Sequence, residues 1–128
     1  MEHKELTEKI IGCAFKVYNK MGFGFLESVY EKCLLIELAK ADLSAEAQKL
    51  ITVYYEDQVV GEFIADIIVE DTIILELKSV TQIVRAHEVQ LVNYLTGTGK
   101  SVGLILNFSP QKLEIKRKYK AYKPQKNK

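Results

Sequence analysis

Residues 63–78 read FIADIIVEDTIILELK. Two runs rich in Ile, Val and Leu flank the acidic pair Glu70-Asp71, a pattern typical of two β-strands joined by a tight hairpin. The second run extends over residues 72–80 and is so apolar that a strand here is expected to be buried on both faces. We therefore predict a buried strand pair in this part of the chain.

Glu76 and Lys78 interrupt the second apolar run. Residues two apart in a strand point to the same face, so Glu76 and Lys78 are neighbours on one face while Ile73, Leu75 and Leu77 point to the other. Burying a carboxylate and an ammonium costs several kcal/mol per ion, roughly, unless partners compensate. The two charged residues in this strand therefore mark a candidate site.

Asp66 lies in the first apolar run, and the hairpin brings it close to Glu76. Two close carboxylates repel each other, and a hard divalent cation bound through oxygen ligands would resolve that conflict. The alternative is a structural ion-pair network of Asp66, Glu76 and Lys78 at a sheet edge. The spacing of the three residues is by itself compatible with both interpretations.

Composition places the chain among ordinary globular proteins. Its 128 residues, 48% hydrophobic and 27% charged, suit a single domain with a full core. No run of about 18 apolar residues is present, so no membrane span is expected. Residues 1–5 are polar and lack the apolar segment of a signal peptide, which favours a cytoplasmic protein in which Cys13 and Cys33 are reduced.

Hydrophobic periodicity organises the rest of the chain. It predicts helices at about 4–20, 26–41 and 85–96, and strands at about 47–55, 59–69, 72–78, 101–108 and 112–118. The passage from one strand through a helix into the next requires parallel pairing, whereas the hairpins are antiparallel. The expected fold class is α/β, with a mixed sheet flanked by helices.

The charge distribution along the chain is uneven, although the net charge is only +1. Residues 112–128 contain eight basic residues and one acidic residue, so the remainder of the chain carries a net negative charge. A basic segment on an acidic body suggests a polyanionic partner, and the alternative is a solvated end that only maintains solubility. Residues 123–128 are expected to be a disordered basic tail. The predicted nucleic-acid contacts are Lys112, Lys116, Arg117, Lys118 and Lys120.

Two predicted helices carry polar residues at helical spacing. Gln90 and Tyr94 are i, i+4 neighbours with His87 on the same stripe, and Glu27 and Tyr30 are i, i+3 neighbours. Each has an ordinary explanation. Tyr94 suits the edge of an apolar face, and Glu27 near a helix N-terminus interacts favourably with the helix dipole. The helix with Gln90 directly follows the Glu76 strand, which favours a shared site.

Gly24, Glu27 and Tyr30 resemble the signature of the GxxExxY proteins, a small prokaryotic group that is similar to the PD-(D/E)XK nuclease superfamily. The resemblance covers almost the whole chain, from the first helix through residues 103–108. It implies a single-domain, restriction-endonuclease-like fold over residues 1–122. The chain departs from the group at Tyr18, where a histidine is usual.

The resemblance also implies roles for individual residues. Asp66 matches the acidic aspartate of the superfamily, and residues 76–78 match its ExK motif. Gln90 and Tyr94 are similar to the QxxxY helix of RecB-like members and would position the phosphate or fix the lysine. Glu27 matches the acidic residue of the first core helix.

These matches imply metal-dependent hydrolysis of a phosphodiester. Asp66 and Glu76 would hold the metal, the backbone carbonyl of Leu77 would complete its coordination, and Glu27 would reach it through water. Lys78 would orient the attacking water or neutralise developing charge. Oxygen ligands favour Mg²⁺ or Mn²⁺.

The function expected from the sequence is a metal-dependent nuclease that acts on DNA. Two rivals remain open: a non-catalytic nucleic-acid-binding module, and a protein-interaction domain whose polar cluster is structural. A homodimer is also predicted, because Phe23, Phe25 and Tyr55 are candidate surface aromatics of the kind enriched in interfaces.

Overall fold

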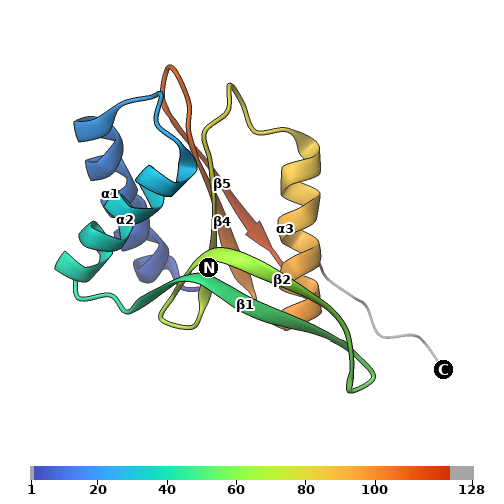
Figure 1. The fold of residues 1–128 in the computed structure, drawn as a ribbon. Helices are drawn as coiled ribbons and strands as arrows, with labels where there is room; N and C mark the ends of the chain where they lie inside the picture. Colours follow the sequence, from blue (N-terminus) through green and yellow to red (C-terminus); the bar gives the residue numbers. More distant parts are fainter. Residues whose placement is uncertain (1, 122–128) are drawn as a thin grey trace.

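The computed structural model describes residues 2–121, which form one five-stranded sheet and three helices that flank it (Figure 1). In chain order these elements are α1 (Lys4–Met21), α2 (Glu27–Lys40), β1 (Ala45–Tyr55), β2 (Gln58–Val69), β3 (Ile73–Lys78), α3 (Arg85–Thr98), β4 (Val102–Phe108) and β5 (Leu113–Tyr119).

The sheet follows the order β1-β2-β3-β4-β5, and only the β3–β4 pair is parallel. That pair runs in register from Ile73 beside Val102 to Lys78 beside Asn107, and α3 forms the crossover between its strands. The other three pairs are antiparallel. The predicted mixed α/β sheet is confirmed, and the boundaries differ by about two residues at β1, which begins at Ala45.

Backbone geometry at the two hairpins explains how β1, β2 and β3 fold onto one another. Glu70 and Asp71 both have positive φ, at 54° and 51°, as do Glu56 and Asp57 at 49° and 66°. Two successive positive-φ residues are the signature of the turn that matches the right-handed twist of strands. The Glu70-Asp71 turn predicted from the sequence therefore fixes the register that brings Asp66 opposite Glu76.

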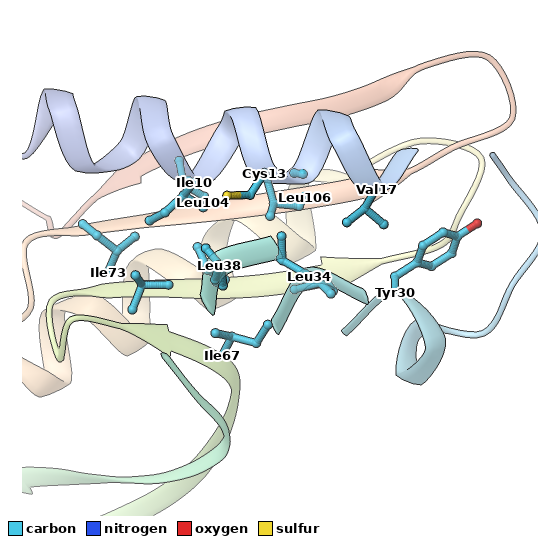
Figure 2. Packing of buried hydrophobic residues seen from close by; sticks show 14 of the residues in the cluster. Ile10, Cys13, Val17, Tyr30, Leu34, Leu38, Ile67, Ile73, Leu104 and Leu106 are labelled. Atoms are coloured by element: carbon cyan, nitrogen blue, oxygen red, sulfur yellow. The ribbon is translucent and has the colours of Figure 1, made fainter. Parts of the chain in front are cut away.

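The sheet has a core on each face. The first lies under α1 and α2, and it includes Ile73, Leu75 and Leu77 of β3 together with buried residues of the two helices. Figure 2 shows part of this core, with Ile73 of β3 near Ile10 of α1 and Leu38 of α2. The second lies under α3, where Ile74 and Ile105 pack beside the helix. Residues of β3 thus alternate between the cores, as the sequence pattern requires.

Three sequence expectations concern the surface. Phe23, Phe25 and Tyr55 are exposed, while the homodimer inferred from them stays a prediction. Within residues 2–121, no helix is long and apolar enough to cross a membrane. The predicted tail at residues 123–128 lies outside the described residues.

Candidate functional site

The candidate site lies where the β2–β3 ladder gives way to side-chain contacts. Backbone pairing between the strands runs from Val69 beside Ile73 to Ile67 beside Leu75. At the next position the Asp66 N–H donates to Glu76 Oε2 over 3.2 Å. One residue further, the Leu77 N–H donates to Asp66 Oδ2 over 2.7 Å. The two carboxylates are therefore held together between the strands.

Glu76 has a strongly perturbed acidity. Burial, followed by the negative charge of Asp66, raises the pKa of Glu76 to about 7. The charge of Glu27 acts in the same direction, whereas the Asp66 N–H and the Lys78 ammonium oppose it. Glu27, Asp66 and Lys78 thus all lie within electrostatic reach of Glu76, and burial outweighs the attraction of the lysine.

Asp66 is also harder to ionise than a free aspartate. Burial raises its pKa, while the Leu77 N–H, the Lys78 charge and a hydrogen bond from the Gln48 side chain work against that rise. Gln48 also donates from Nε2 to Glu31 Oε1 over 2.6 Å, which links β1 to α2. Sequence reasoning assigned no role to Gln48. Its position in β1 opposite Asp66 is set by the hairpin register, which the sequence alone did not fix.

Glu27 is placed beside the acids by the loop that precedes α2. Glu27 is the first residue of α2 and is exposed. The Ser79 hydroxyl, one residue beyond Lys78, donates to the Phe25 carbonyl over 3.0 Å and ties this loop to the end of β3. Tyr30, the last residue of the Gly24–Glu27–Tyr30 pattern, is fully buried and belongs to the core rather than to the site surface.

Asn107 holds the chain that leaves β3. This side chain is fully buried in β4, accepts the Val80 N–H over 2.9 Å and donates to the Val80 carbonyl over 3.0 Å. It also donates to Glu114, which in turn accepts the Ile83 N–H over 2.9 Å. An amide inside the otherwise apolar run of β4 was a signal that sequence reasoning did not use.

The donor set fits a hard cation. Within residues 2–121 no group of three or more His, Cys, Asp or Glu side chains is arranged to hold a metal by itself. Mg²⁺ commonly takes only one or two protein carboxylates, with water and phosphate oxygens completing its shell. Because the N–H and C=O of a strand residue point to the same side, the Leu77 carbonyl is directed toward β2, as its N–H is. Asp66, Glu76 and this carbonyl form a suitable set of oxygen donors.

Gln90 and Tyr94 belong to α3, which packs on the sheet face that carries Ile74 and Ile105. Tyr94 stacks on Phe63 of β2, with ring centroids 3.6 Å apart. Both residues line an open hollow along α3. Among the described residues, no hydrogen bond or ring contact joins either one to Asp66, Glu76 or Lys78. Their role in positioning the phosphate or the lysine stays a prediction. His87 accepts the Val84 N–H over 3.3 Å at the start of α3.

The basic residues of β5 are divided between the two faces of the sheet. Arg117 pairs with Leu104 and donates to Thr7 of α1 over 2.7 Å. Lys116 and Lys118 point to the α3 face, where Lys118 forms an ion pair with Glu88 at 2.9 Å. Lys112 and Lys120 are exposed at the two ends of the strand. Arg117 therefore lies on the opposite sheet face from Lys116 and Lys118, and nucleic-acid contact by the five residues stays a prediction.

Comparisons with known proteins agree with this architecture. The sequence model of the PD-(D/E)XK nuclease superfamily matches residues 4–118. Among curated proteins, none matches the chain. A solved structure titled "Crystal structure of SSO0001" is similar in fold, with a TM-score of 0.59 and 17% sequence identity. The similarity covers 75% of this chain and 50% of that one, so this chain spans about half the length of that protein.

Proposed function

The chain belongs to the PD-(D/E)XK nuclease superfamily, and we propose that it is a metal-dependent nuclease that hydrolyses DNA. One observation carries the proposal. Asp66 and Glu76 are held together between two strands, and burial with mutual repulsion raises the pKa of Glu76 to about 7. A folded protein keeps such an electrostatic conflict most readily where a cation is to be bound.

Each residue of the site has a chemical role in this proposal. Asp66 and Glu76 would hold Mg²⁺ or Mn²⁺ with the Leu77 carbonyl, and Glu27 would contribute through a water molecule. When bound, such an ion lowers the pKa of coordinated water and offsets charge on the phosphate. Lys78 orients the attacking water or stabilises the charge that develops on the phosphate oxygens. Gln48 and the Leu77 N–H keep Asp66 oriented toward this centre.

The finer assignment to the GxxExxY group rests on Gly24, Glu27 and Tyr30. Gly24 has a φ of 118°, a backbone conformation that residues other than glycine rarely adopt. Tyr30 anchors the same loop from the core, and Glu27 is the member of the pattern that lies nearest the acids. The pattern therefore supports a constrained loop that delivers one carboxylate to the site.

The direct test is cleavage of labelled single-stranded and duplex DNA in Mg²⁺ or Mn²⁺. Glu76→Gln and Lys78→Met are expected to lower the rate at least about 10²-fold, the usual cost of losing a group that stabilises the transition state. Glu56→Gln, at the distant tip of the β1–β2 hairpin, is the matched control and should leave the rate unchanged. Cleavage that survives Glu76→Gln would reject the proposed site. Binding without cleavage by the unaltered protein would support the non-catalytic module instead.

A further inference from the structure

The loop between α1 and α2 holds three large apolar side chains in solvent. Phe23 is 47% exposed, Phe25 is 43% exposed and Leu26 is 76% exposed. All three line the same hollow, so they form a small shared apolar surface. Isolated exposed apolar residues are ordinary, whereas a contiguous group beside a candidate site indicates a binding surface.

The fold holds this loop in place. Tyr30 stacks on Phe108 in the core with ring centroids 4.1 Å apart. Its hydroxyl donates to the Gly22 carbonyl over 2.5 Å and accepts the Phe25 N–H over 3.3 Å. The Phe25 ring meets the Tyr30 ring edge to face at 6.0 Å. A buried side chain thus fixes the backbone on both sides of Phe23, so the exposed rings are presented in a defined conformation.

The loop is continuous with the acid site. Ser79, next to Lys78, donates to the Phe25 carbonyl, and Glu27 lies close enough to Glu76 to influence its ionisation. A hollow of about 550 Å³ is lined by Ser79 and residues 23–27. An occupant of this hollow would therefore also lie beside the charged groups at the end of β3.

We propose that the hollow formed by residues 23–27 and Ser79 binds an unpaired nucleobase of the substrate, which stacks on Phe23 or Phe25. This inference rests on the proposed nuclease function and specifies its substrate as DNA that is single-stranded next to the cleaved bond. A nucleobase has an apolar face and is attached to the sugar-phosphate backbone. The acid site would bind the phosphate of that backbone. Stacking on aromatic rings is the usual way to hold such a base without reading its sequence. Paired bases inside a duplex do not expose these faces.

The experiment measures binding separately from cleavage. The Glu76→Gln protein in Mg²⁺ serves as the non-cleaving form, and its affinity is measured for a single-stranded oligonucleotide and for the same sequence in a duplex. One base is replaced by 2-aminopurine, whose fluorescence reports stacking. Phe23→Leu/Phe25→Leu is expected to weaken single-strand binding about 5- to 150-fold and to abolish the 2-aminopurine response. Duplex affinity should change less than about twofold.

Two controls separate stacking from structural damage. Phe23→Tyr/Phe25→Tyr keeps an aromatic face at both positions and should restore binding. Phe15→Leu removes a ring of similar exposure from α1 and should change nothing. Unchanged single-strand affinity in the Leu variant would overturn the inference. So would a loss of self-association in sedimentation with intact DNA binding, because the loop would then be a protein interface.

The outcomes also distinguish this inference from the proposed function. If cleavage depends on Glu76 but its rate is unchanged by both loop substitutions, the proposed stacking surface is rejected and the nuclease function is retained. If single-strand binding requires the rings of Phe23 and Phe25 but no metal supports cleavage, the nuclease function is rejected and the stacking surface is retained. Failure of the unaltered protein and of Glu76→Gln to bind either oligonucleotide would overturn both.

Discussion

Asp66 and Glu76 join β2 to β3 where the backbone ladder stops. The backbone N–H of Asp66 donates to the Glu76 carboxylate, and the Asp66 carboxylate accepts the next N–H of β3, from Leu77. Each acid therefore replaces a backbone carbonyl that the separating strands no longer supply. The arrangement satisfies the polar backbone and at the same time brings two negative charges into a partly buried space, which is the origin of the raised pKa of Glu76.

The first prediction concerns the pH dependence of stability without metal. The pKa of Glu76 rises from 4.5 to about 7 on folding, so the folded state holds this proton more tightly than the unfolded chain does. Its stabilising effect is complete below about pH 4.5 and is lost as the pH rises through 7. Glu76→Gln removes this dependence. The variant should gain about 2–3 kcal/mol of unfolding free energy relative to the unaltered protein between about pH 4 and pH 8.

Urea unfolding at a series of pH values in EDTA measures this difference. Glu56→Gln provides the control, because Glu56 is exposed at the tip of the β1–β2 hairpin, in a turn rather than between the strands where Glu76 is held. A difference between Glu76→Gln and the unaltered protein that stays constant from about pH 4 to pH 8 would contradict the burial of Glu76 as an acid.

The second prediction concerns metal linkage. A cation placed between Asp66 and Glu76 removes their repulsion, so Mg²⁺ or Mn²⁺ should stabilise the folded state by about 2.7 kcal/mol at a concentration of 100 times its Kd. The gain should increase as the pH rises toward 8, because metal binding requires deprotonated carboxylates. Asp66→Asn should lose most of it. The measurement is the shift in unfolding midpoint with metal concentration, and equal shifts in the variant and the unaltered protein would place the bound ion elsewhere.

The fold and the acid pair were accessible to sequence reasoning for one reason: they are local. Residues 63–78 contain both strands and their turn, so period-two alternation and turn chemistry were enough to place Asp66 beside Glu76. The position of Tyr94 was not accessible in this way. Its stacking on Phe63 depends on how α3 is rotated against the sheet, and helical spacing alone does not determine that rotation.

The basic segment illustrates a signal that was present and unused. Consecutive residues of a strand point to opposite faces. The sequence Lys116-Arg117-Lys118 therefore already implied that the Arg117 side chain lies on the opposite sheet face from the two lysines. Gln48 is the opposite case. Its contact with Asp66 joins residues on two strands, and nothing near Gln48 in the sequence distinguishes it from other polar residues of β1.

The third prediction tests whether Asn107 positions Lys78 through its hydrogen bonds to the Val80 backbone. Asn107→Leu removes both hydrogen bonds to Val80 and should cost about 1–3 kcal/mol of stability, because backbone groups lose their partner. Val80 follows Lys78 by two residues, so the lysine should lose its fixed position. We expect the cleavage rate to fall by up to about 10²-fold, a cost that small misplacements near a reacting group can reach.

A variant of similar stability cost separates positioning from general damage. Ile10→Val, in the core under α1, should cost about 0.5–1.5 kcal/mol and leave the cleavage rate at its original value. Equal rates for Asn107→Leu and Ile10→Val at a temperature where both are folded would show that Asn107 only stabilises the fold.

The fourth prediction concerns the basic residues of β5, which should act differently because they face different sides of the sheet. Lys116 is exposed on the α3 face, whereas Arg117 is partly buried against Thr7 of α1. If Lys116 neutralises one phosphate, Lys116→Ala should make the slope of log K against log salt shallower by about 0.7–0.9. Arg117→Lys should leave that slope unchanged and should instead lower stability by about 1 kcal/mol, since the lysine cannot reproduce the guanidinium geometry. Salt titrations of DNA binding and urea unfolding of the same two variants give both quantities. A reduced slope in Arg117→Lys with an unchanged slope in Lys116→Ala would mean that DNA approaches the α1 face, opposite to the expected side.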